Sequence, residues 1–414
     1  MNPSIAIIGG GPSGLLFARL LEVNGITDYV VFERDESPVP GPWQQGGTLD
    51  LHGPSGQLAL KRAGLFDRFS EEFARWDASR MHIVDPNGET VVMFGEDDRN
   101  SPEIDRLQLR QLLLDSVPSE KIRWGHGVSA LERRTDEEPS DKERDNGCII
   151  RFSNGSSASG FRLIVGADGT WSKVRPLLTP TKPVYSGKMF IEGSLSIDNP
   201  SYAMAREMAG SGGMLAIGNK KAIAVQQLAD RTYRVYFGLT VPENFYSHRS
   251  SVIADDLTDR TEAMRSLLSS SSDYFATHGP QLKAFVTNAE GPFRSWPLYR
   301  FDPEVVGWAR NVSRGVTLLG DAAHATTLFV GEGVNCSMHD AVVLADSVVE
   351  HCGKGTSFSN DNAMLESALA SYEKDMFLRG RELIRRSTES EATIFSDDAP
   401  ARFMEFLTAL IAKR

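Results

Sequence analysis

The sequence has few cysteines, no long apolar run and no excess of positive charge. Cys148, Cys336 and Cys352 are its three cysteines and show no CxxC spacing, so neither a disulfide framework nor a zinc site is indicated. No apolar run is long enough to span a membrane, and no basic region precedes the first apolar stretch as in a signal peptide. These absences predict a soluble, cytoplasmic protein in a reducing compartment.

The charge balance is acidic, with 44 Lys and Arg residues against 55 Asp and Glu residues and a formal net charge of −11. Nucleic acids and anionic membranes are bound through basic faces, so we expect neither as a partner. Hydrophobic residues make up 41% of the chain, which is enough for a large core. A length of 414 residues predicts about two to three domains.

A glycine-rich turn lies between the apolar stretch Ile5-Ala6-Ile7-Ile8 and a helical pattern over residues 15–21. The turn, Gly9-Gly10-Gly11-Pro12-Ser13-Gly14, matches GxGxxG. In this motif Gly9 permits a tight turn, Gly11 lets backbone N–H groups approach a pyrophosphate, and Gly14 lets the helix pack closely on the strand.

Glu33 gives a second signal, because it stands 19 residues after Gly14, at the end of the apolar run 29–32. A carboxylate in this place accepts hydrogen bonds from the ribose hydroxyls of an adenosine. The glycines alone are also compatible with a turn that binds nothing. Together the two signals predict a dinucleotide site, without distinguishing NAD from FAD.

Two more apolar stretches end in an aspartate next to a glycine. Leu163-Ile164-Val165-Gly166-Ala167-Asp168-Gly169 is the first, and Val316-Thr317-Leu318-Leu319-Gly320-Asp321 is the second. The second is followed by Gly331-Glu332-Gly333-Val334-Asn335, which opens a helical pattern. Because ligands of open parallel sheets lie beyond the carboxyl ends of the strands, we expect Asp168 and Asp321 to face the dinucleotide.

The remaining pattern indicates how the chain is organised. Residues 148–152 and 161–165 are expected as paired strands, and the charged segment 133–147 as an exposed hairpin loop. Short alternating runs between Lys188 and Val241 predict a separate antiparallel sheet. Residues 338–349 are expected as a helix, 353–362 as a linker and 363–414 as helical. The apolar stripe of that tail, which should pack on the body, comprises Phe403, Phe406, Leu407, Leu410 and Ile411.

With these three motifs in this order, the sequence resembles the group A FAD-dependent monooxygenases of the aromatic hydroxylase type. Within that family it is most similar to the tetracycline-modifying flavin monooxygenases. The segments that carry this second likeness are 46–52, 55–57, 63–65, 102–106, Leu109-Arg110 and Gly320-Asp321-Ala322-Ala323-His324.

The resemblance implies an α/β fold, α+β overall, with a Rossmann-like FAD-binding domain, an antiparallel-sheet substrate domain and a long C-terminal helix. The FAD-binding domain would comprise residues 1–75, 96–180 and 297–355. The substrate domain would comprise 76–95 and 181–296, and a C-terminal helical segment would follow over 356–414.

The resemblance also implies the cofactor site. Asp50 and Arg106 would lie by the flavin, although without the resemblance a structural salt bridge between them is favoured. Glu33 with Arg34 would hold the adenosine half. The expected cofactor-binding residues are Gly9, Gly11, Pro12, Ser13, Gly14, Glu33, Arg34, Gly47, Leu49, Asp50, Arg106, Arg110, Asp168, Gly320, Asp321, Gly331, Gly333, Val334 and Asn335.

The sequence departs from the tetracycline enzymes where those enzymes contact substrate. Arg234-Val235-Tyr236-Phe237-Gly238 has no histidine, and Thr327-Leu328-Phe329-Val330 lacks a proline that many family members carry. These differences argue against tetracycline itself as the substrate. We expect the 188–241 sheet to roof an apolar pocket over the flavin, with Tyr236, Phe237, Trp296 and Phe329 as candidate substrate contacts.

The reaction implied by the resemblance uses non-covalent FAD, NAD(P)H as a transient co-substrate and O2. A C4a-hydroperoxyflavin would then insert one oxygen atom, by hydroxylation or epoxidation, into an aromatic or polycyclic, possibly polyketide-like, small molecule. The alternatives are a flavin oxidase or reductase of the same fold, or a non-catalytic flavin-dependent binding protein. A monomer or weak homodimer is expected.

Two further residues invite a chemical role but favour a structural one. Cys336 would sit near the flavin as a small buried residue rather than a redox group. His324 has no second histidine or carboxylate at metal-ligand spacing, so we expect a hydrogen-bonding role and no metal site. No catalytic acid or base is assigned.

Overall fold

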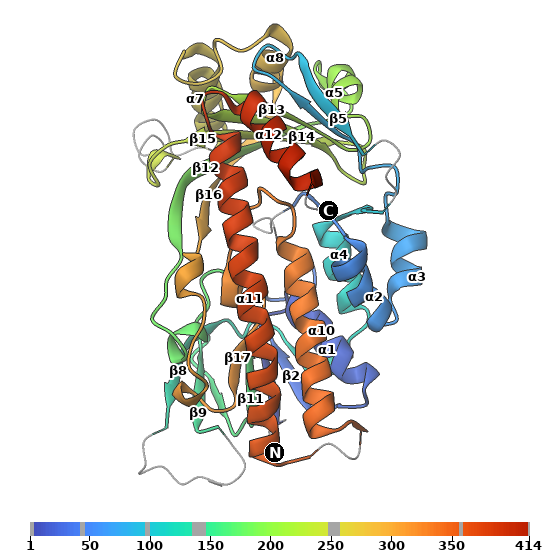
Figure 1. Cartoon of the computed structure of the whole chain (residues 1–414), viewed down its shortest axis with the longest axis vertical. Helices are drawn as coiled ribbons and strands as arrows, with labels where there is room; N and C mark the ends of the chain where they lie inside the picture. Colours follow the sequence, from blue (N-terminus) through green and yellow to red (C-terminus); the bar gives the residue numbers. More distant parts are fainter. Residues whose placement is uncertain are drawn as a thin grey trace.

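The computed structural model describes residues 4–41, 46–95, 100–134, 146–246, 257–355 and 359–412. Figure 1 shows an elongated molecule with a parallel sheet toward one end, a larger sheet at the other, and a long helix, α11 (Asn362–Ile394), running between them. The mixed helix and sheet fold expected from the resemblance is confirmed, including the long C-terminal helix.

The parallel sheet has the strand order β17-β11-β1-β2-β7. Its central strands are apolar and buried on both faces, as parallel strands covered by helices must be. Helix α1 (Pro12–Val23) packs between α10 (Gly333–Cys352) and α4 (Arg106–Leu114). The strands are β1 (Ile5–Ile8), β2 (Tyr29–Phe32), β7 (Ile122–Arg123), β11 (Leu163–Gly166) and β17 (Val316–Leu318).

A second, three-stranded sheet lies at the same end and corrects one prediction. Strand β9 (Cys148–Phe152) pairs with β8 (Val128–Arg133) and β10 (Ser157–Ser159), not with the segment 161–165. That segment contributes β11, which pairs with β1 and β17 in the parallel sheet. The β8–β9 hairpin is present as expected, and residues 135–145 of its loop lie outside the described residues.

The larger sheet has seven strands in the order β16-β12-β15-β14-β13-β4-β5. It is antiparallel as predicted, except where β13 runs parallel to β4. Its strands come from the two parts of the chain expected to form the substrate domain, although β16 runs on to Arg300; the domain boundaries themselves stay a prediction. The strands are β4 (Met81–Val84), β5 (Thr90–Phe94), β12 (Val184–Leu195), β13 (Gly213–Gly218), β14 (Lys221–Gln227), β15 (Tyr233–Thr240) and β16 (Glu290–Arg300).

Both faces of this sheet are covered. Phe237, Phe275 and Phe293 belong to a core on the outer face, beneath helices α5 (Tyr202–Ala209), α7 (Leu257–Ser270) and α8 (Pro280–Asn288). The inner face belongs to another core, which includes Phe190 and Phe395. In Figure 1 the outer helices lie above the sheet, and the parallel sheet with its helices lies below it.

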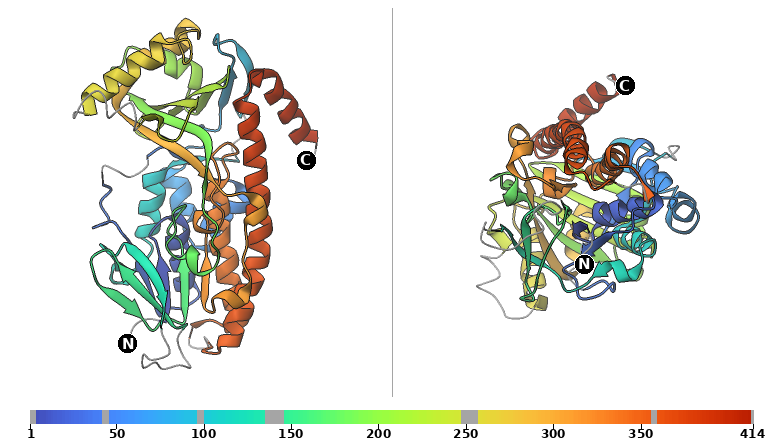
Figure 2. Two further views of the ribbon diagram at one scale, coloured as in Figure 1. Left: turned by 90° about the vertical axis from the view of Figure 1, so that its left-hand side faces the viewer. Right: turned by 90° about the horizontal axis from the view of Figure 1, so that it is seen from below.

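The C-terminal tail forms two helices rather than one. Helix α11 packs along α10, and α12 (Ala399–Ala412) turns back from the top of α11, as the left view of Figure 2 shows. Phe403 is buried in the inner core and the partly buried Leu407 packs against it, as predicted; Phe406 is also partly buried. The side chains of Leu410 and Ile411 lie outside the described residues.

Short elements complete the described fold. Strands β3 (Thr48–Asp50) and β6 (Glu103–Asp105) form a small antiparallel pair. The remaining α-helices are α2 (Leu58–Arg62), α3 (Phe66–Arg68) and α9 (Asp321–His324). Among the described helices, none combines the length and the apolar character needed to cross a membrane.

Phe237→Ala should destabilise the protein by about 3–5 kcal/mol, because Phe237 is fully buried among other aromatic rings. Tyr236→Phe should leave the stability nearly unchanged, because the Tyr236 hydroxyl has no hydrogen-bond partner among the described residues. Urea unfolding of both variants beside the wild type measures the difference. Equal stability losses would contradict the assignment of the two side chains to opposite faces.

Candidate active site

The glycine-rich turn is as tight as the sequence motif requires. Gly9 has φ +111°, and a Cβ there would lie 2.3 Å from the carbonyl oxygen of Ala167. A Cβ on Gly14 would lie 2.1 Å from the carbonyl oxygen of Gly9. A Cβ on Gly11, in contrast, would meet nothing within 4 Å. Two of the three glycines are therefore needed by the fold, and the third borders open space.

The same turn leaves the start of α1 available to a ligand. Gly11 is the N-cap of α1, Pro12 is its first residue, and no side chain caps the helix. The first N–H groups of a helix have no partner within the helix, and together they carry partial positive charge. The open space beside Gly11 and the uncapped helix end together fit a pyrophosphate.

Glu33 lies beside this turn, and its side chain is buried. Its carboxylate accepts hydrogen bonds from the backbone N–H groups of Gly10 (2.5 Å) and Asp35 (3.0 Å). It therefore shapes the turn itself, a function that the sequence motif alone did not indicate. Arg110 donates to Asp35 (2.9 Å) and holds the following segment, whereas Arg34 is exposed.

Asp168 follows β11 directly. One of its carboxylate oxygens accepts from the backbone N–H of Lys173 (2.6 Å), and the other, Oδ1, is buried without a partner. Burial raises the pKa of Asp168 above its usual value. An acceptor without a donor in a buried place fits a ligand hydroxyl, as expected for a cofactor site.

Asp321 follows β17 through Gly320, whose φ of +55° favours glycine. Part of the Asp321 side chain is open to solvent. The protein atoms packed around its carboxyl group nevertheless desolvate it and raise its pKa. The register of the parallel sheet pairs Ile8 with Gly166 and Gly166 with Leu318. The glycine-rich turn, Asp168 and Asp321 therefore lie at one edge of the sheet.

Arg106 and Asp50 do not form the salt bridge that the residues alone favoured. Asp50 pairs with His52 (2.7 Å), and the described residues include no ion-pair partner for Arg106 within 4 Å. Burial lowers the pKa of Arg106, opposed by the charge of Asp321 and by Tyr236. The backbone N–H of Arg106 donates to the carbonyl oxygen of Gly47 (2.9 Å), and its side-chain Nε is buried without a partner among the described residues.

Asn335 connects the turn at the start of α10 to the segment after β3. Its side-chain nitrogen donates to the carbonyl oxygen of Asp50 (2.8 Å), and its side-chain oxygen accepts from the N–H groups of His52 (2.8 Å) and Gly56 (3.2 Å). A Cβ on Gly331 would lie 3.4 Å from Asp50. Asp50 and the 331–335 turn, predicted as parts of one site, are therefore neighbours.

Gly47, the residue just before β3, lies against the large sheet. It has φ +88°, and a Cβ there would lie 2.8 Å from the Tyr236 hydroxyl. Leu49 is buried on β3 in the core around the parallel sheet. Gly333 and Val334 begin α10, with Val334 packed against the same core. Roles of all these residues toward a cofactor stay predictions.

Three of the four candidate substrate residues share one face, and one was misplaced. Tyr236, Trp296 and Phe329 pack against the inner core of the large sheet. Phe237 is fully buried in the outer core instead, because adjacent residues of a strand point to opposite faces. Phe237 is therefore wrong as a substrate contact.

The sequence did not reveal the role of two charged residues on the inner face, Glu192 and Arg234. Glu192 stands opposite Tyr236 in the β12–β15 register and is buried. It accepts from the indole N–H of Trp296 (2.7 Å) and pairs with Arg234 (3.1 Å). The signal available in the sequence was a glutamate inside the apolar run of β12.

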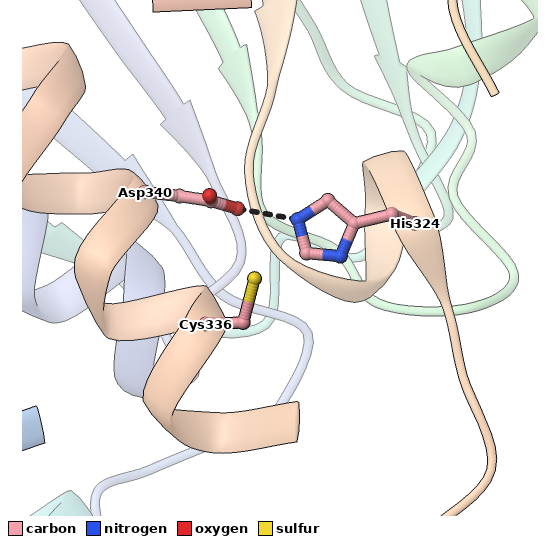
Figure 3. A group of neighbouring side chains, drawn as sticks. All are labelled: His324, Cys336 and Asp340. Carbon is pink, nitrogen blue, oxygen red and sulfur yellow. Dashed lines mark hydrogen bonds and ion pairs between the residues drawn. The ribbon is translucent and has the colours of Figure 1, made fainter. Parts of the chain in front are cut away.

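His324 has the hydrogen-bonding role expected of it, with a carboxylate that sequence spacing did not reveal. His324, Cys336 and Asp340 lie side by side (Figure 3), and His324 Nε2 is 2.6 Å from Asp340. The other Asp340 oxygen accepts from Arg379 (2.8 Å). Burial lowers the pKa of His324, but the carboxylate outweighs it and raises that pKa overall.

The same cluster has the residue types of a metal site, but its groups are not available as ligands. Asp340 also accepts from the Gly320 N–H (2.9 Å), so both of its oxygens already have donors. Burial raises the pKa of the Cys336 thiol, which disfavours the thiolate that a metal requires. The group is best described as a buried ion-pair network beside the Gly-Asp motif.

Gly11→Ala should leave the melting temperature of the apoprotein unchanged and weaken FAD binding about tenfold or more, because its methyl group enters only the open space. Gly14→Ala should lower the apoprotein melting temperature, because its methyl group strikes the Gly9 carbonyl. Thermal unfolding and FAD titration of the two variants measure this. Unchanged FAD affinity in Gly11→Ala would contradict the placement of the pyrophosphate.

The chain is similar to known proteins over most of its length. Residues 3–249 match the family described as "FAD binding domain". Monooxygenase asqM of Emericella nidulans is 31% identical, over 96% of this chain and 97% of that protein. Klebsiella pneumoniae HpxO, solved with FAD and uric acid, has a TM-score of 0.71 at 24% identity and covers 99% of this chain and 92% of its own.

The tetracycline destructase Tet(55) has the same fold, with a TM-score of 0.69 at 16% identity, covering 99% of this chain and 95% of its own. The likeness to the tetracycline-modifying enzymes is thereby confirmed at the level of fold. The family match covers more than half of the chain, and the asqM match covers nearly all of it. The chain therefore belongs to the FAD-binding-domain family and, within it, to the FAD-dependent monooxygenases of the aromatic hydroxylase type.

Proposed function

We propose that this protein uses NAD(P)H and O2 to insert one oxygen atom, by hydroxylation or epoxidation, into an aromatic or polycyclic, possibly polyketide-like, molecule. The observation that carries the proposal is the position of Arg106. Its backbone N–H donates to the carbonyl oxygen of Gly47 (2.9 Å), and a Cβ on Gly47 would lie 2.8 Å from the Tyr236 hydroxyl of the aromatic sheet face. The charge of Asp321 also acts on the Arg106 guanidinium, so we infer that Arg106 borders both halves of the candidate site.

The cofactor half would be held by residues from four segments. The start of α1 would bind the pyrophosphate, with Glu33 on the adenosine side. Asp168 and Asp321 would accept from cofactor hydroxyls, and the 331–335 turn would contact the ring end. FAD, when bound, supplies the redox chemistry with NAD(P)H and O2. Nothing in the described site requires a covalent link to the cofactor, so we propose that FAD binds non-covalently.

The substrate half would be formed by the inner face of the large sheet. Phe190, Tyr236, Trp296 and Phe329 line this face and would pack on a ring system and exclude water from it. The uric acid bound by HpxO is a planar heterocycle of the kind such a face suits. The Tyr236 hydroxyl and Arg106 would donate hydrogen bonds to an oxygen atom of the substrate.

The test begins with protein purified with its flavin. Acid precipitation should release FAD into the supernatant. The holoprotein is then supplied with NADH or NADPH under ¹⁸O2, with a panel of phenols, quinolones and polycyclic ketones. Incorporation of one ¹⁸O atom into a product supports the proposal. NAD(P)H oxidation that yields only H2O2 across the panel indicates an oxidase, and retained FAD without NAD(P)H oxidation indicates a binding protein.

Asp321→Ala should weaken FAD binding about tenfold to hundredfold without unfolding the protein. The lost hydrogen bond to a charged group is worth about 1.5–3 kcal/mol. Asp273→Ala, at an exposed turn away from the motif, is the matched control. Titration of the two apoproteins with FAD, followed by flavin fluorescence, measures the change. Equal affinities would remove Asp321 from the cofactor site.

We further propose a cytoplasmic location and a monomeric or weakly dimeric state, on the basis of the cysteine usage and the acidic charge. The division into an FAD-binding and a substrate domain is proposed with the same boundaries as above. The separation of the two large sheets supports it.

A further inference from the structure

The long helix α11 contacts the site segment at two levels. At the lower level, Arg379 donates to Asp340, which in turn accepts from the Gly320 N–H (2.9 Å). Gly380 lies against His324, and a Cβ on Gly380 would lie only 2.7 Å from the His324 Cβ. This level of contacts holds the Gly-Asp motif of the cofactor site.

At the upper level, α11 holds the segment 325–332, which joins the Gly-Asp motif to the start of α10. The Ser387 hydroxyl donates to the carbonyl oxygen of Thr327 (2.6 Å), and the Ser390 hydroxyl donates to the carbonyl oxygen of Phe329 (2.8 Å). Arg386 pairs with Glu332 through both of its terminal nitrogens. The backbone of this segment is therefore bonded to the helix at successive points.

The two serines are unusual residues for the places they occupy. Both are buried, on the same face of α11 as Gly380 and Ile394. A buried hydroxyl is unfavourable unless it is hydrogen-bonded, and hydroxyls in helices commonly bond the carbonyl four residues earlier. Thr388 and Thr393 of the same helix do so, to Ile384 (2.8 Å) and Glu389 (3.0 Å).

Ser387 and Ser390 instead satisfy carbonyls of another segment. A loop carbonyl that points at a helix needs such a donor, because the backbone N–H groups of the helix are already used. The side chain held in this way is Phe329. Its ring packs on Phe190 (6.0 Å between centroids) and on Phe395 (5.6 Å), both in the inner core of the sheet.

We propose that Ser387 and Ser390 are positioning residues that hold Phe329 in the wall of the substrate chamber, against the aromatic face of the large sheet. Through them α11 sets the shape of the substrate chamber, while the lower contacts of α11 support the cofactor motif. This role goes beyond the proposed reaction. Its test needs no substrate, so it stands or falls separately from the substrate class.

The experiment compares three FAD-loaded proteins: the wild type, Ser387→Ala/Ser390→Ala, and the control Thr388→Ala/Thr393→Ala. The control removes two hydroxyls from the same helix that bond only to the helix itself. Amide hydrogen exchange is followed in peptides covering 325–332, and iodide quenching of the flavin fluorescence reports access to the ring. FAD affinity and melting temperature are measured in parallel.

In the serine variant we expect exchange in 325–332 to be about tenfold faster, because the segment loses both bonds to its backbone carbonyls and the bond between the Ser387 and Thr327 hydroxyls. Iodide should quench the flavin more strongly, while FAD affinity changes less than about twofold. The control should match the wild type in all four measurements. If the double serine variant does not fold, Ser390→Ala alone should show the same changes to a smaller extent.

Two results would overturn the proposal. Exchange in 325–332 equal to that of the threonine control would mean that the serines do not hold the segment. A loss of FAD affinity in step with the faster exchange would mean that the upper contacts serve the cofactor site, not a separate wall.

Discussion

The parallel register of three strands is the constraint on which the site depends. Ile8, Gly166 and Leu318 stand side by side in β1, β11 and β17. Each strand ends within two or three residues of a motif, so one register brings together motifs that are more than 150 residues apart in sequence. The close contact of Gly9 with Ala167 locks this edge, because any side chain on Gly9 would strike the neighbouring backbone. A slip of one residue would turn the aspartates away from the turn.

The motifs could be predicted because each is contiguous and carries its own chemistry. What failed was the assignment of side chains to faces where both faces are buried. Polar and apolar residues do not alternate cleanly around Tyr236 and Phe237 in β15, because both faces of this strand are covered. Helices α7 and α8 cover one face, and the inner core covers the other. Alternation reveals orientation only when one face meets water. The predicted pairing of 148–152 with 161–165 was wrong for a similar reason, because an apolar run does not indicate which other strand it pairs with.

The charged residues beneath the site could not be found from spacing, because their partners are distant in the chain. Asp340, Arg379 and Glu192 look like surface residues, yet Asp340 and Glu192 are buried. Burying a charge is costly unless a counter-charge and hydrogen bonds accompany it, so each marks a place where the fold brings partners together. Asp340 meets this requirement with three donors: His324 of α9, the backbone N–H of Gly320 just before α9, and Arg379 of α11. For Asp340 the sequence signal was an acid within an apolar helical pattern.

Donors outnumber acceptors on the side of the site that faces the large sheet, and this imbalance bears on what binds there. Both oxygens of Glu192 are used, by Trp296 and Arg234. Arg106 and Arg234 each keep a buried Nε without a partner, and the Tyr236 hydroxyl has no partner among the described residues. A donor that is left unpaired when a ligand binds costs more free energy than a lost apolar contact. Such a face therefore discriminates more strongly against a ligand without polar atoms than against a polar ligand whose ring differs in size. The aromatic rings around it then select for a flat molecule, and the donors select for one that carries oxygen.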